Sequence, residues 1–259
     1  MIKQFGLIGE KLGHSLSPTI HNKIFEILNI QASYKLFPVP MENIEQLAEW
    51  IKIFDISGVN VTIPYKQTVM SKLDYISEEA QEIGAVNTIS NINGKLHGYN
   101  TDYYGFGDLL QVNNISVENK TTTVLGTGGS SKAVIAYLKN QNVKKIYWVS
   151  RTKSSDHIDY EDLNEIKSDI LINTTPVGMS PNIDDSPVSA DIIQNHDILV
   201  DLIYNPKATS FLQIGQEQNK KTVGGMHMLI AQAVKAEEIW HNTKISSDFY
   251  KDIKKEVIL

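Results

Sequence analysis

Short apolar runs rich in isoleucine and valine alternate with segments of helical period along most of this chain. Such alternation is typical of a parallel β-sheet covered by helices, because a crossover helix follows each strand. Within the first 63 residues the pattern predicts strands at 1–8, 34–39 and 58–63, and helices at 18–28 and 44–54. We therefore expect an α/β fold.

The next stretch interrupts this pattern. The dipeptide Asn93-Gly94 separates two apolar runs, 86–90 and 95–99, and it favours the tight type I′ turn of a β-hairpin. A short helix over 102–110 is expected to follow. The polar residues 111–120 lack periodicity, so we place a domain boundary there.

A second alternating series follows the boundary. Its expected strands lie at 121–125, 145–149, 170–173, 198–203 and 221–223. Its expected helices lie at 130–140, 160–166, 226–241 and from 247 onward. Periodicity leaves open whether the last helices pack on the second series or on the first. Length is also ambiguous, because 259 residues fit about two domains of ~150 residues or one α/β barrel of about 250 residues.

Composition excludes several classes of function. The formal net charge of -6 provides no basic field for nucleic acid or anionic lipid. The absence of cysteine removes disulfides, thiolate metal sites and cysteine nucleophiles. Glu10 and Lys11 interrupt the first apolar run, and no run approaches the ~18 apolar residues of a membrane span. We expect a cytoplasmic protein without a metal site, since the seven histidines form no HExxH motif.

A glycine-rich turn stands between a predicted strand and a predicted helix. Glycines there let the backbone approach a pyrophosphate, whose charge is met by the free N–H groups of the helix N-terminus. The dinucleotide fingerprint has a third glycine where this chain has Ser131, so strand and helix are expected to pack further apart. A tight turn without a ligand is the alternative. The expected cofactor contacts are Gly126, Thr127, Gly128, Gly129 and Ser130.

The end of the following strand indicates which dinucleotide would bind. Ser150-Arg151-Thr152-Lys153 lies about 25 residues after the first glycine, where NAD sites usually carry an acidic residue for the ribose 2′-hydroxyl. Cations and hydroxyls suit a 2′-phosphate instead. We infer NADP(H), with Arg151 stacking on adenine or pairing with phosphate. In the alternative interpretation, Arg151 and Lys153 are solvated loop charges.

Two serines stand before the first predicted helix. Ser15 and Ser17 offer two hydroxyls next to free backbone N–H groups, an arrangement that can hold a carboxylate. Ser17 is also expected to be the N-cap of the helix, with Pro18 in the first helical position. An ordinary helix cap is the alternative explanation of Ser17.

Further polar residues stand at the ends of neighbouring strands. Asn60 and Thr62 share one face of their strand, and Lys66 is expected to begin the next helix near the same edge. Asn87 begins the hairpin, and Asp102 follows its end. Each residue also has a purely structural explanation, such as a surface lysine, a turn asparagine or a helix-capping aspartate.

Taken together, these segments resemble the shikimate dehydrogenase family, in the family's order and over essentially the whole chain. The most specific are HSLSPTIHN at 14–22 and NVTIPYK at 60–66, since Rossmann glycines occur in many families. The other matching stretches are GAVNT at 84–88, GYNTD at 98–102, GTGGSSKA at 126–133, SRT at 150–152, NTTPVGM at 173–179, DLIYNP at 201–206 and GGMHMLIAQA at 224–233.

The resemblance implies a two-domain α/β fold and an activity. An N-terminal substrate domain, here 1–112, is completed by C-terminal helices, here 237–259, and a Rossmann-type doubly wound NADP-binding domain, here 113–236, is inserted between them. The active site is expected in the cleft between the domains. Family members reduce 3-dehydroshikimate reversibly to shikimate with NADPH, in aromatic amino-acid biosynthesis.

The resemblance also implies roles for single residues. Ser15 and Ser17 would bind the ring carboxylate, Tyr204 would approach the substrate, and Gly225 would approach the nicotinamide. We expect His14 to help fix the serine loop. We count Asn60 among the substrate contacts. The ring hydroxyls would be bound by Thr62, Lys66, Asn87, Asp102 and Gln232.

Lys66 is the expected acid in reduction and the expected base in alcohol oxidation, with Asp102 orienting it. A neighbouring carboxylate favours the charged ammonium, so we expect Lys66 to act mainly by electrostatic stabilisation and proton delivery. One alternative is a quinate or quinate/shikimate dehydrogenase using NAD or NADP. Another is a catalytically silent NADP-sensing or scaffolding protein, against which the presence of Lys66 and Asp102 argues. The protein is expected to be a monomer or a homodimer.

Overall fold

The computed structural model describes residues 2–13 and 15–258 and contains two β-sheets, each in its own compact unit. Unit 1 comprises 1–105 and 230–259, and unit 2 comprises Phe106–Leu229. The limits of the units lie inside helices α4 (Thr101–Val112) and α8 (Met226–His241), and the domain limits expected from the sequence fall later in the same two helices. Two separate sheets exclude the single α/β barrel.

Unit 1 contains a six-stranded sheet in the order β2-β1-β3-β5-β6-β4. Its strands are β1 (Lys3–Gly9), β2 (Ala32–Pro38), β3 (Ile56–Val61), β4 (Tyr75–Ile76), β5 (Thr88–Ile92) and β6 (Lys95–Tyr99). Strands β1, β2 and β3 are parallel, whereas β5 is antiparallel to both β3 and β6. The edge where β1, β3 and β6 end is therefore the edge where β5 begins.

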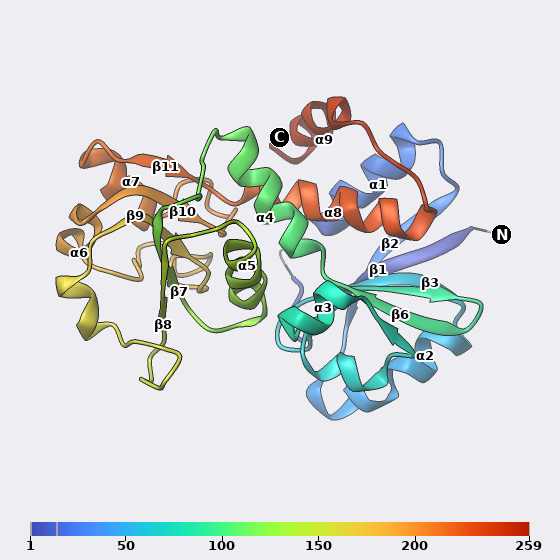
Figure 1. The fold of residues 1–259 in the computed structure, drawn as a ribbon. Coiled ribbons are helices and arrows are strands. Elements are labelled where there is room, and N and C mark those ends of the chain that lie inside the picture. The colour runs from blue at the N-terminus through green and yellow to red at the C-terminus, as the bar shows by residue number, and fades with distance from the viewer. Residues whose placement is uncertain (1, 14, 259) are drawn as a thin grey trace. The chain divides into compact units, whose positions relative to one another are not determined.

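Two layers of helices cover this sheet (Figure 1). On one face, α2 (Leu47–Ile53) and α3 (Glu78–Ile83) contribute to an apolar core with the 3₁₀ helices η1 (Met41–Gln46) and η2 (Thr68–Lys72). On the other face, α1 (Ser17–Ile27) and α8 pack around Phe5 and Trp240. Gly58 permits this packing, because a Cβ there would lie 2.4 Å from the Trp240 indole nitrogen.

The C-terminal elements return to unit 1, which resolves the question that periodicity left open. These elements are the second part of α8, η4 (Ser247–Phe249) and α9 (Tyr250–Ile258). The Trp240 indole N–H donates to the Ile89 carbonyl oxygen at 2.9 Å, which ties α8 to the sheet. The completion of the N-terminal α/β domain by C-terminal helices is thus confirmed.

Unit 2 contains a five-stranded, wholly parallel sheet in the order β11-β10-β9-β7-β8. Its strands are β7 (Thr121–Leu125), β8 (Lys145–Val149), β9 (Ser168–Asn173), β10 (His196–Asp201) and β11 (Lys221–Val223). Numbered along the chain, this is the doubly wound order 2-1-3-4-5, whose switch point lies between the first and third strands. The carboxyl ends of β7 and β9 therefore flank the crevice in which such sheets bind nucleotides.

The helices of unit 2 lie on both faces of its sheet. Helix α5 (Gly129–Lys139) and the second part of α4 share one apolar core. The opposite core is lined by η3 (Glu161–Glu165), α6 (Ala190–Gln194) and α7 (Ser210–Glu217). The Thr209 hydroxyl oxygen caps α7 by accepting the Leu212 N–H at 3.4 Å. This doubly wound arrangement was predicted, and it is confirmed.

Most expected elements are present, but short ones were missed. The hairpin of β5 and β6 forms as predicted, with positive φ at both Asn93 (53°) and Gly94 (81°) as a type I′ turn requires. The elements β4, α3 and α6 were not predicted, because they have six residues or fewer and leave no readable period. Helix α7, with eight residues, was also missed. Within the described residues, no helix is long and apolar enough to span a bilayer.

Candidate active site

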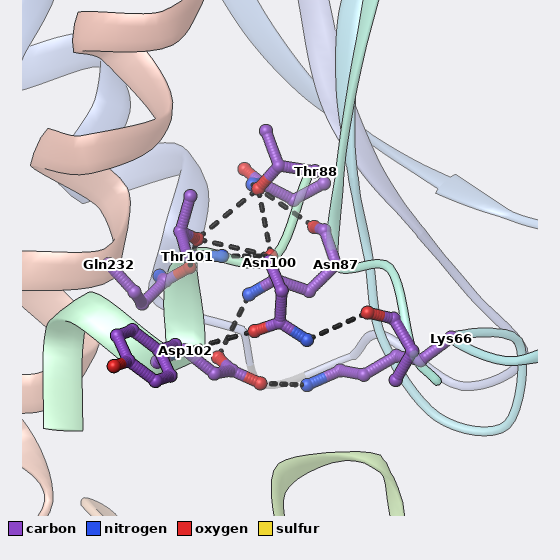
Figure 2. A network of polar contacts seen from close by, with 10 residues as sticks. Lys66, Asn87, Thr88, Asn100, Thr101, Asp102 and Gln232 are labelled. Carbon is purple, nitrogen blue, oxygen red and sulfur yellow. Dashed lines mark hydrogen bonds and ion pairs between the residues drawn. The ribbon is translucent and has the colours of Figure 1, made fainter. Parts of the chain in front are cut away.

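Lys66 and Asp102 meet at the sheet edge where β3 ends and α4 begins (Figure 2). Lys66 Nζ lies 2.5 Å from Asp102 Oδ2. Their side chains are only 11% and 9% exposed, so the ion pair is largely shielded from water. The Val86 N–H donates to the Lys66 carbonyl oxygen at 2.7 Å, which fixes the lysine backbone. An ammonium and a carboxylate are thus held together in a nearly buried position.

Lys66 does not begin a helix, and that part of the prediction is wrong. It lies in a turn between the end of β3 at Val61 and η2. Pro64 has no N–H to donate, and the Tyr65 N–H bonds back to the Thr62 carbonyl oxygen at 2.9 Å. The chain therefore turns before it can form a helix, and this turn carries Lys66 to the edge of the sheet.

Asn87 connects the ion pair to the hairpin. Its side-chain amide donates to Asp102 Oδ1 at 2.9 Å, so the two carboxylate oxygens have different partners. Its Oδ1 accepts the Thr101 N–H at 2.7 Å and the Thr88 hydroxyl at 3.0 Å. These bonds fix the orientation of the amide, and the amide in turn holds the carboxylate that faces Lys66 (Figure 2).

Two threonines that were not predicted complete this network. The Thr88 and Thr101 hydroxyl oxygens lie 3.2 Å apart, and both side chains are buried. Gln232, on α8, meets the network through its Oε1, which accepts the Thr101 hydroxyl at 3.4 Å. The sequence signal for both threonines was their place directly beside Asn87 and Asp102. Helix α8 thereby contributes a side chain to a site otherwise made by the sheet and α4.

Asn60 is buried, and its side chain is engaged by protein groups. Its Oδ1 accepts the Tyr34 hydroxyl at 2.7 Å, and its amide donates to the Thr88 hydroxyl oxygen at 3.0 Å. Burial raises the pKa of Tyr34 well above its ordinary value, which keeps the phenol protonated as a donor. Asn60 was predicted as a substrate contact, and in the structure its side chain supports Thr88.

The serine loop follows β1 at the same edge of the sheet. Helix α1 begins at Ser17, and Leu16 occupies the cap position, so the predicted cap role of Ser17 is wrong. The Ser15 hydroxyl oxygen instead accepts the Ser17 N–H at 3.2 Å and satisfies one donor of the first turn. Ser17 is buried and Ser15 half-buried. His14, expected to fix this loop, lies outside the described residues.

Thr62 lies just beyond β3, at the same sheet edge. Its N–H donates to the Ile8 carbonyl oxygen at 2.8 Å, and its side chain is half-buried. Gly9 admits the threonine, because a Cβ at Gly9 would lie 2.6 Å from Thr62 Cγ2. Topology therefore gathers hydroxyls, an ammonium, a carboxylate and two amides at one edge of the sheet in unit 1.

The glycine-rich turn of unit 2 lies at the switch point of its sheet. Gly126 has φ 100°, and a Cβ there would lie 2.9 Å from Thr175 Cγ2 and 3.0 Å from Thr174 Oγ1. A Cβ at Gly128 would meet nothing within 4 Å, so the space beside this turn is open. Helix α5 begins at Gly129, with its first N–H groups at the turn. The turn therefore combines open space with free N–H groups, the features that can bind a phosphate group.

Ser131 replaces the third glycine of the fingerprint and is fully buried. Its hydroxyl donates to the Gly126 carbonyl oxygen at 2.5 Å and accepts the Trp148 indole N–H at 2.8 Å. The hydroxyl thus ties the glycine turn to β8. This role was not predicted.

The segment after β8 carries the expected 2′-phosphate contacts. Arg151, Thr152 and Lys153 are exposed, and the Ser150 hydroxyl oxygen accepts the Thr152 N–H at 3.2 Å. Lys153 Nζ lies 2.8 Å from the carboxylate of Asp162, which sequence reasoning missed. The hydrogen bond from Lys153 lowers the pKa of Asp162 and raises that of Lys153 itself. Arg151 is therefore the stronger candidate for a phosphate contact.

A buried aspartate organises the turns that carry Tyr204 and Gly225. Asp201 accepts the Thr209 hydroxyl at 2.6 Å and the Ile203 N–H at 3.0 Å, and burial raises its pKa to about 6. The Gly225 N–H donates to the Ile203 carbonyl oxygen at 3.0 Å. A Cβ at Gly225 would lie 2.1 Å from a backbone oxygen, so only glycine fits there. Burial also raises the pKa of Tyr204.

Residues 7–89 match the family model described as the shikimate dehydrogenase substrate binding domain. A shikimate dehydrogenase (NADP(+)) of Clostridium beijerinckii is 55% identical over 252 residues, which cover 94% of this chain and 93% of that protein. This chain belongs to the shikimate dehydrogenase family. The predicted resemblance is thus confirmed.

Solved shikimate dehydrogenase structures have the same fold. That of shikimate dehydrogenase 1 from Peptoclostridium difficile matches with a TM-score of 0.95 at 50% identity, covering 99% of this chain and 98% of that chain. A shikimate dehydrogenase structure from Thermus thermophilus, in complex with NADP(H) and shikimate, matches with a TM-score of 0.89 at 29% identity. The match covers 98% of this chain and 99% of that chain. The two-domain fold with a Rossmann-type NADP-binding domain is confirmed.

Proposed function

We propose that this protein is an NADP-dependent shikimate dehydrogenase, which reduces 3-dehydroshikimate reversibly to shikimate in aromatic amino-acid biosynthesis. The observation that carries the proposal is the pairing of Lys66 with Asp102, 2.5 Å apart and held by Asn87, in a chain of this family. A protein that only sensed NADP would not need this pair. The activity belongs where NADPH is supplied, in the cytoplasm, and the protein acts as a monomer or a homodimer.

The residues of unit 1 suit a small carboxylate that bears hydroxyl groups. Ser15 and Ser17 are proposed to bind the carboxylate, with help from the N–H groups of the first turn of α1. A site of this kind discriminates between substrates, because polar groups of the protein stay unpaired when a bound molecule lacks a hydroxyl. Asn60 is assigned a supporting role behind these contacts, because Tyr34 and Thr88 already engage its side chain. The ring hydroxyls are proposed to bind Thr62, Lys66, Asn87, Asp102 and Gln232.

Lys66 is proposed to deliver the proton. NADPH, when bound, supplies a hydride that adds to the carbonyl carbon of 3-dehydroshikimate, and negative charge develops on the carbonyl oxygen. The Lys66 ammonium stabilises that charge and gives the oxygen its proton, which yields the alcohol and a neutral amine. The Asp102 carboxylate orients the ammonium, and Asn87 holds the carboxylate. In alcohol oxidation the same amine takes the proton back.

Unit 2 is proposed to hold the cofactor. The open space beside Gly128 and the helix N-terminus at Gly129 suit the pyrophosphate. Arg151 is proposed to contact the 2′-phosphate together with Ser150 and Thr152, while Lys153 contributes less because Asp162 pairs with it. The glycine-rich turn adds Gly126, Thr127 and Ser130 as proposed cofactor contacts, and the resemblance adds Gly225 with the nicotinamide and Tyr204 with the substrate.

Oxidation rates with shikimate and quinate, each with NADP⁺ and NAD⁺, test this proposal. We expect the highest kcat/KM with shikimate and NADP⁺. A higher kcat/KM with quinate would make the protein a quinate dehydrogenase, and a preference for NAD⁺ would overturn the cofactor assignment. No oxidation of either substrate would leave only a nucleotide-binding role.

A further inference from the structure

A cluster of titratable side chains is buried in unit 1 where α1 and α8 pack on the sheet. Glu237 and His21 are fully buried, and Glu237 Oε1 lies 2.5 Å from His21 Nδ1. His241 Nε2 lies 3.0 Å from the second carboxylate oxygen of Glu237. Burying a carboxyl group and two imidazoles is costly compared with packing apolar side chains of similar volume. Stability alone therefore gives no reason for this cluster.

Tyr34 connects the cluster to the substrate site. The His21 ring stacks on the Tyr34 ring with centroids 4.0 Å apart and planes 4° apart. The Tyr34 hydroxyl donates to Asn60 Oδ1 at 2.7 Å, and the nearby Ser17 side chain partly offsets the rise in its pKa. The phenol thus lies near the serine loop and is hydrogen-bonded to Asn60, which supports Thr88.

Helix α8 provides a second connection. Glu237 and Trp240 lie on α8 after Gln232, whose Oε1 accepts the Thr101 hydroxyl. The indole of Trp240 stacks on Phe5 at 4.8 Å and donates to the Ile89 carbonyl oxygen. The contacts of Glu237 and Trp240 therefore hold α8 in the rotation that brings Gln232 to the site.

We propose that Glu237 and His21 are positioning residues of the substrate site, acting through Tyr34 on Ser17 and Asn60 and through α8 on Gln232. This inference rests on the proposed function and deepens it, because it concerns how the site recognises its carboxylate and hydroxyl groups. Neither residue touches the substrate. Loss of the pair is expected to weaken substrate binding selectively, while the cofactor residues of unit 2 keep their geometry.

The charge state of the pair supports this role. Burial raises the pKa of Glu237 well above its ordinary value and lowers that of His21 to about 3, so burial favours the uncharged form of both side chains. Burial also lowers the pKa of His241, with a smaller contribution from Lys3 on β1, and Tyr34 stays protonated. An uncharged cluster does not repel a carboxylate bound at the serine loop.

The test compares Glu237→Leu with Glu237→Gln in the full chain. Leucine removes the hydrogen bond to His21, whereas glutamine keeps an uncharged group of the same shape. We expect Glu237→Leu to raise KM for shikimate about tenfold, the effect of roughly one lost hydrogen bond, with KM for NADP⁺ nearly unchanged. Glu237→Gln is expected to stay within about threefold of wild type for both substrates. His196→Gln is the matched control, because His196 is a fully buried, hydrogen-bonded histidine of unit 2.

The outcomes separate the inference from the proposed function. An unchanged KM for shikimate in folded Glu237→Leu, or equal rises in both KM values, overturns the positioning role while wild-type activity stands. A wild-type protein without activity on shikimate overturns the proposed function and this inference together. If Glu237→Leu does not fold, Tyr34→Phe replaces it, because it removes only the hydroxyl. An unchanged KM for shikimate in Tyr34→Phe contradicts the inference.

Discussion

The Lys66 ammonium lies 2.5 Å from Asp102 Oδ2, although 36 residues separate the two along the chain. The antiparallel strand β5 brings Asn87 to the same edge, where its amide holds the other carboxylate oxygen at 2.9 Å. Removing either partner of so shielded a pair leaves a charge without compensation. This geometry supports the proposed orienting role of Asp102 and the proposed proton delivery by Lys66.

Replacing Lys66 by alanine removes the proton donor. We expect kcat for 3-dehydroshikimate reduction to fall by about 10²–10⁴-fold, the usual contribution of a positioned acid. Asp102→Asn keeps the shape of the side chain and is expected to lower kcat less, since the ammonium remains. Steady-state kinetics in both directions measures these effects. An unchanged kcat with an altered KM in Lys66→Ala would reduce the role of this lysine to binding.

Arg151→Ala tests the choice of cofactor. Loss of a charge-assisted contact with the 2′-phosphate is expected to raise KM for NADPH by about tenfold or more, with little change in KM for NADH. Lys153→Ala is the matched control, because Asp162 already pairs with that ammonium, and a smaller effect is expected. Equal changes in KM for NADPH and NADH in Arg151→Ala would contradict the 2′-phosphate assignment.

Two alanine substitutions distinguish the contribution of the glycine turn to stability from its proposed contribution to cofactor binding. Gly126→Ala forces a side chain into φ 100° and against Thr174 and Thr175, so we expect a loss of roughly 1–3 kcal/mol in the free energy of unfolding. Gly128→Ala has φ -76° and open space, so stability is expected to stay within about 0.5 kcal/mol. Its methyl group would nevertheless occupy the space assigned to the pyrophosphate.

Urea denaturation and NADPH titration of both glycine variants check this contrast. Gly128→Ala is expected to bind NADPH more weakly while remaining as stable as wild type. Unimpaired NADPH binding by Gly128→Ala would show that the pyrophosphate lies elsewhere.

Glu237 makes stability depend on pH with a defined sign. Because its pKa is raised above the ordinary 4.5, its contribution is fully present below pH 4.5 and is lost as the pH rises towards the folded-state value. His21, lowered from 6.5 to about 3, has the opposite effect between those values, so the two offset each other from about pH 4.5 to 6.5. The effect of His21 ends at pH 6.5, whereas the loss from Glu237 continues only up to its folded-state pKa.

Glu237→Gln isolates this contribution. Relative to wild type, the variant is expected to gain about 1.4 kcal/mol in the free energy of unfolding per pH unit from pH 4.5 up to the folded-state pKa of Glu237, because it has no proton to lose. Urea denaturation of both proteins between pH 5 and pH 8 measures the difference. A difference that does not change with pH would show that Glu237 is ionised in the folded protein.

The pattern of apolar residues predicted most of the fold, because the apolar runs form strands that are buried in the sheet of one unit or the other. The predicted helix limits were wrong where local hydrogen bonds determine the backbone. Pro64 and the hydrogen bond from Tyr65 to Thr62 turn the chain before Lys66. The Ser15 hydroxyl accepts the Ser17 N–H, and α1 begins at Ser17. Such local competition leaves no periodic signal.

Only those site residues that lie in recognisable sequence motifs could be predicted. Lys66, Asn87 and Asp102 stood in recognisable segments, and the structure brings all three together. Tyr34 and Glu237 stand in no such segment, and their importance comes from contacts between β2, α1 and α8 that are distant in sequence. Asp162 likewise became relevant only when folding brought it to Lys153.

The most direct test of the central claim is the absorbance of NADPH after addition of 3-dehydroshikimate to the purified protein. We predict that wild type consumes NADPH in step with the formation of shikimate, and that Lys66→Ala does so at least about a hundredfold more slowly. No consumption of NADPH by a folded wild-type protein, or an equal rate in Lys66→Ala, would contradict the account.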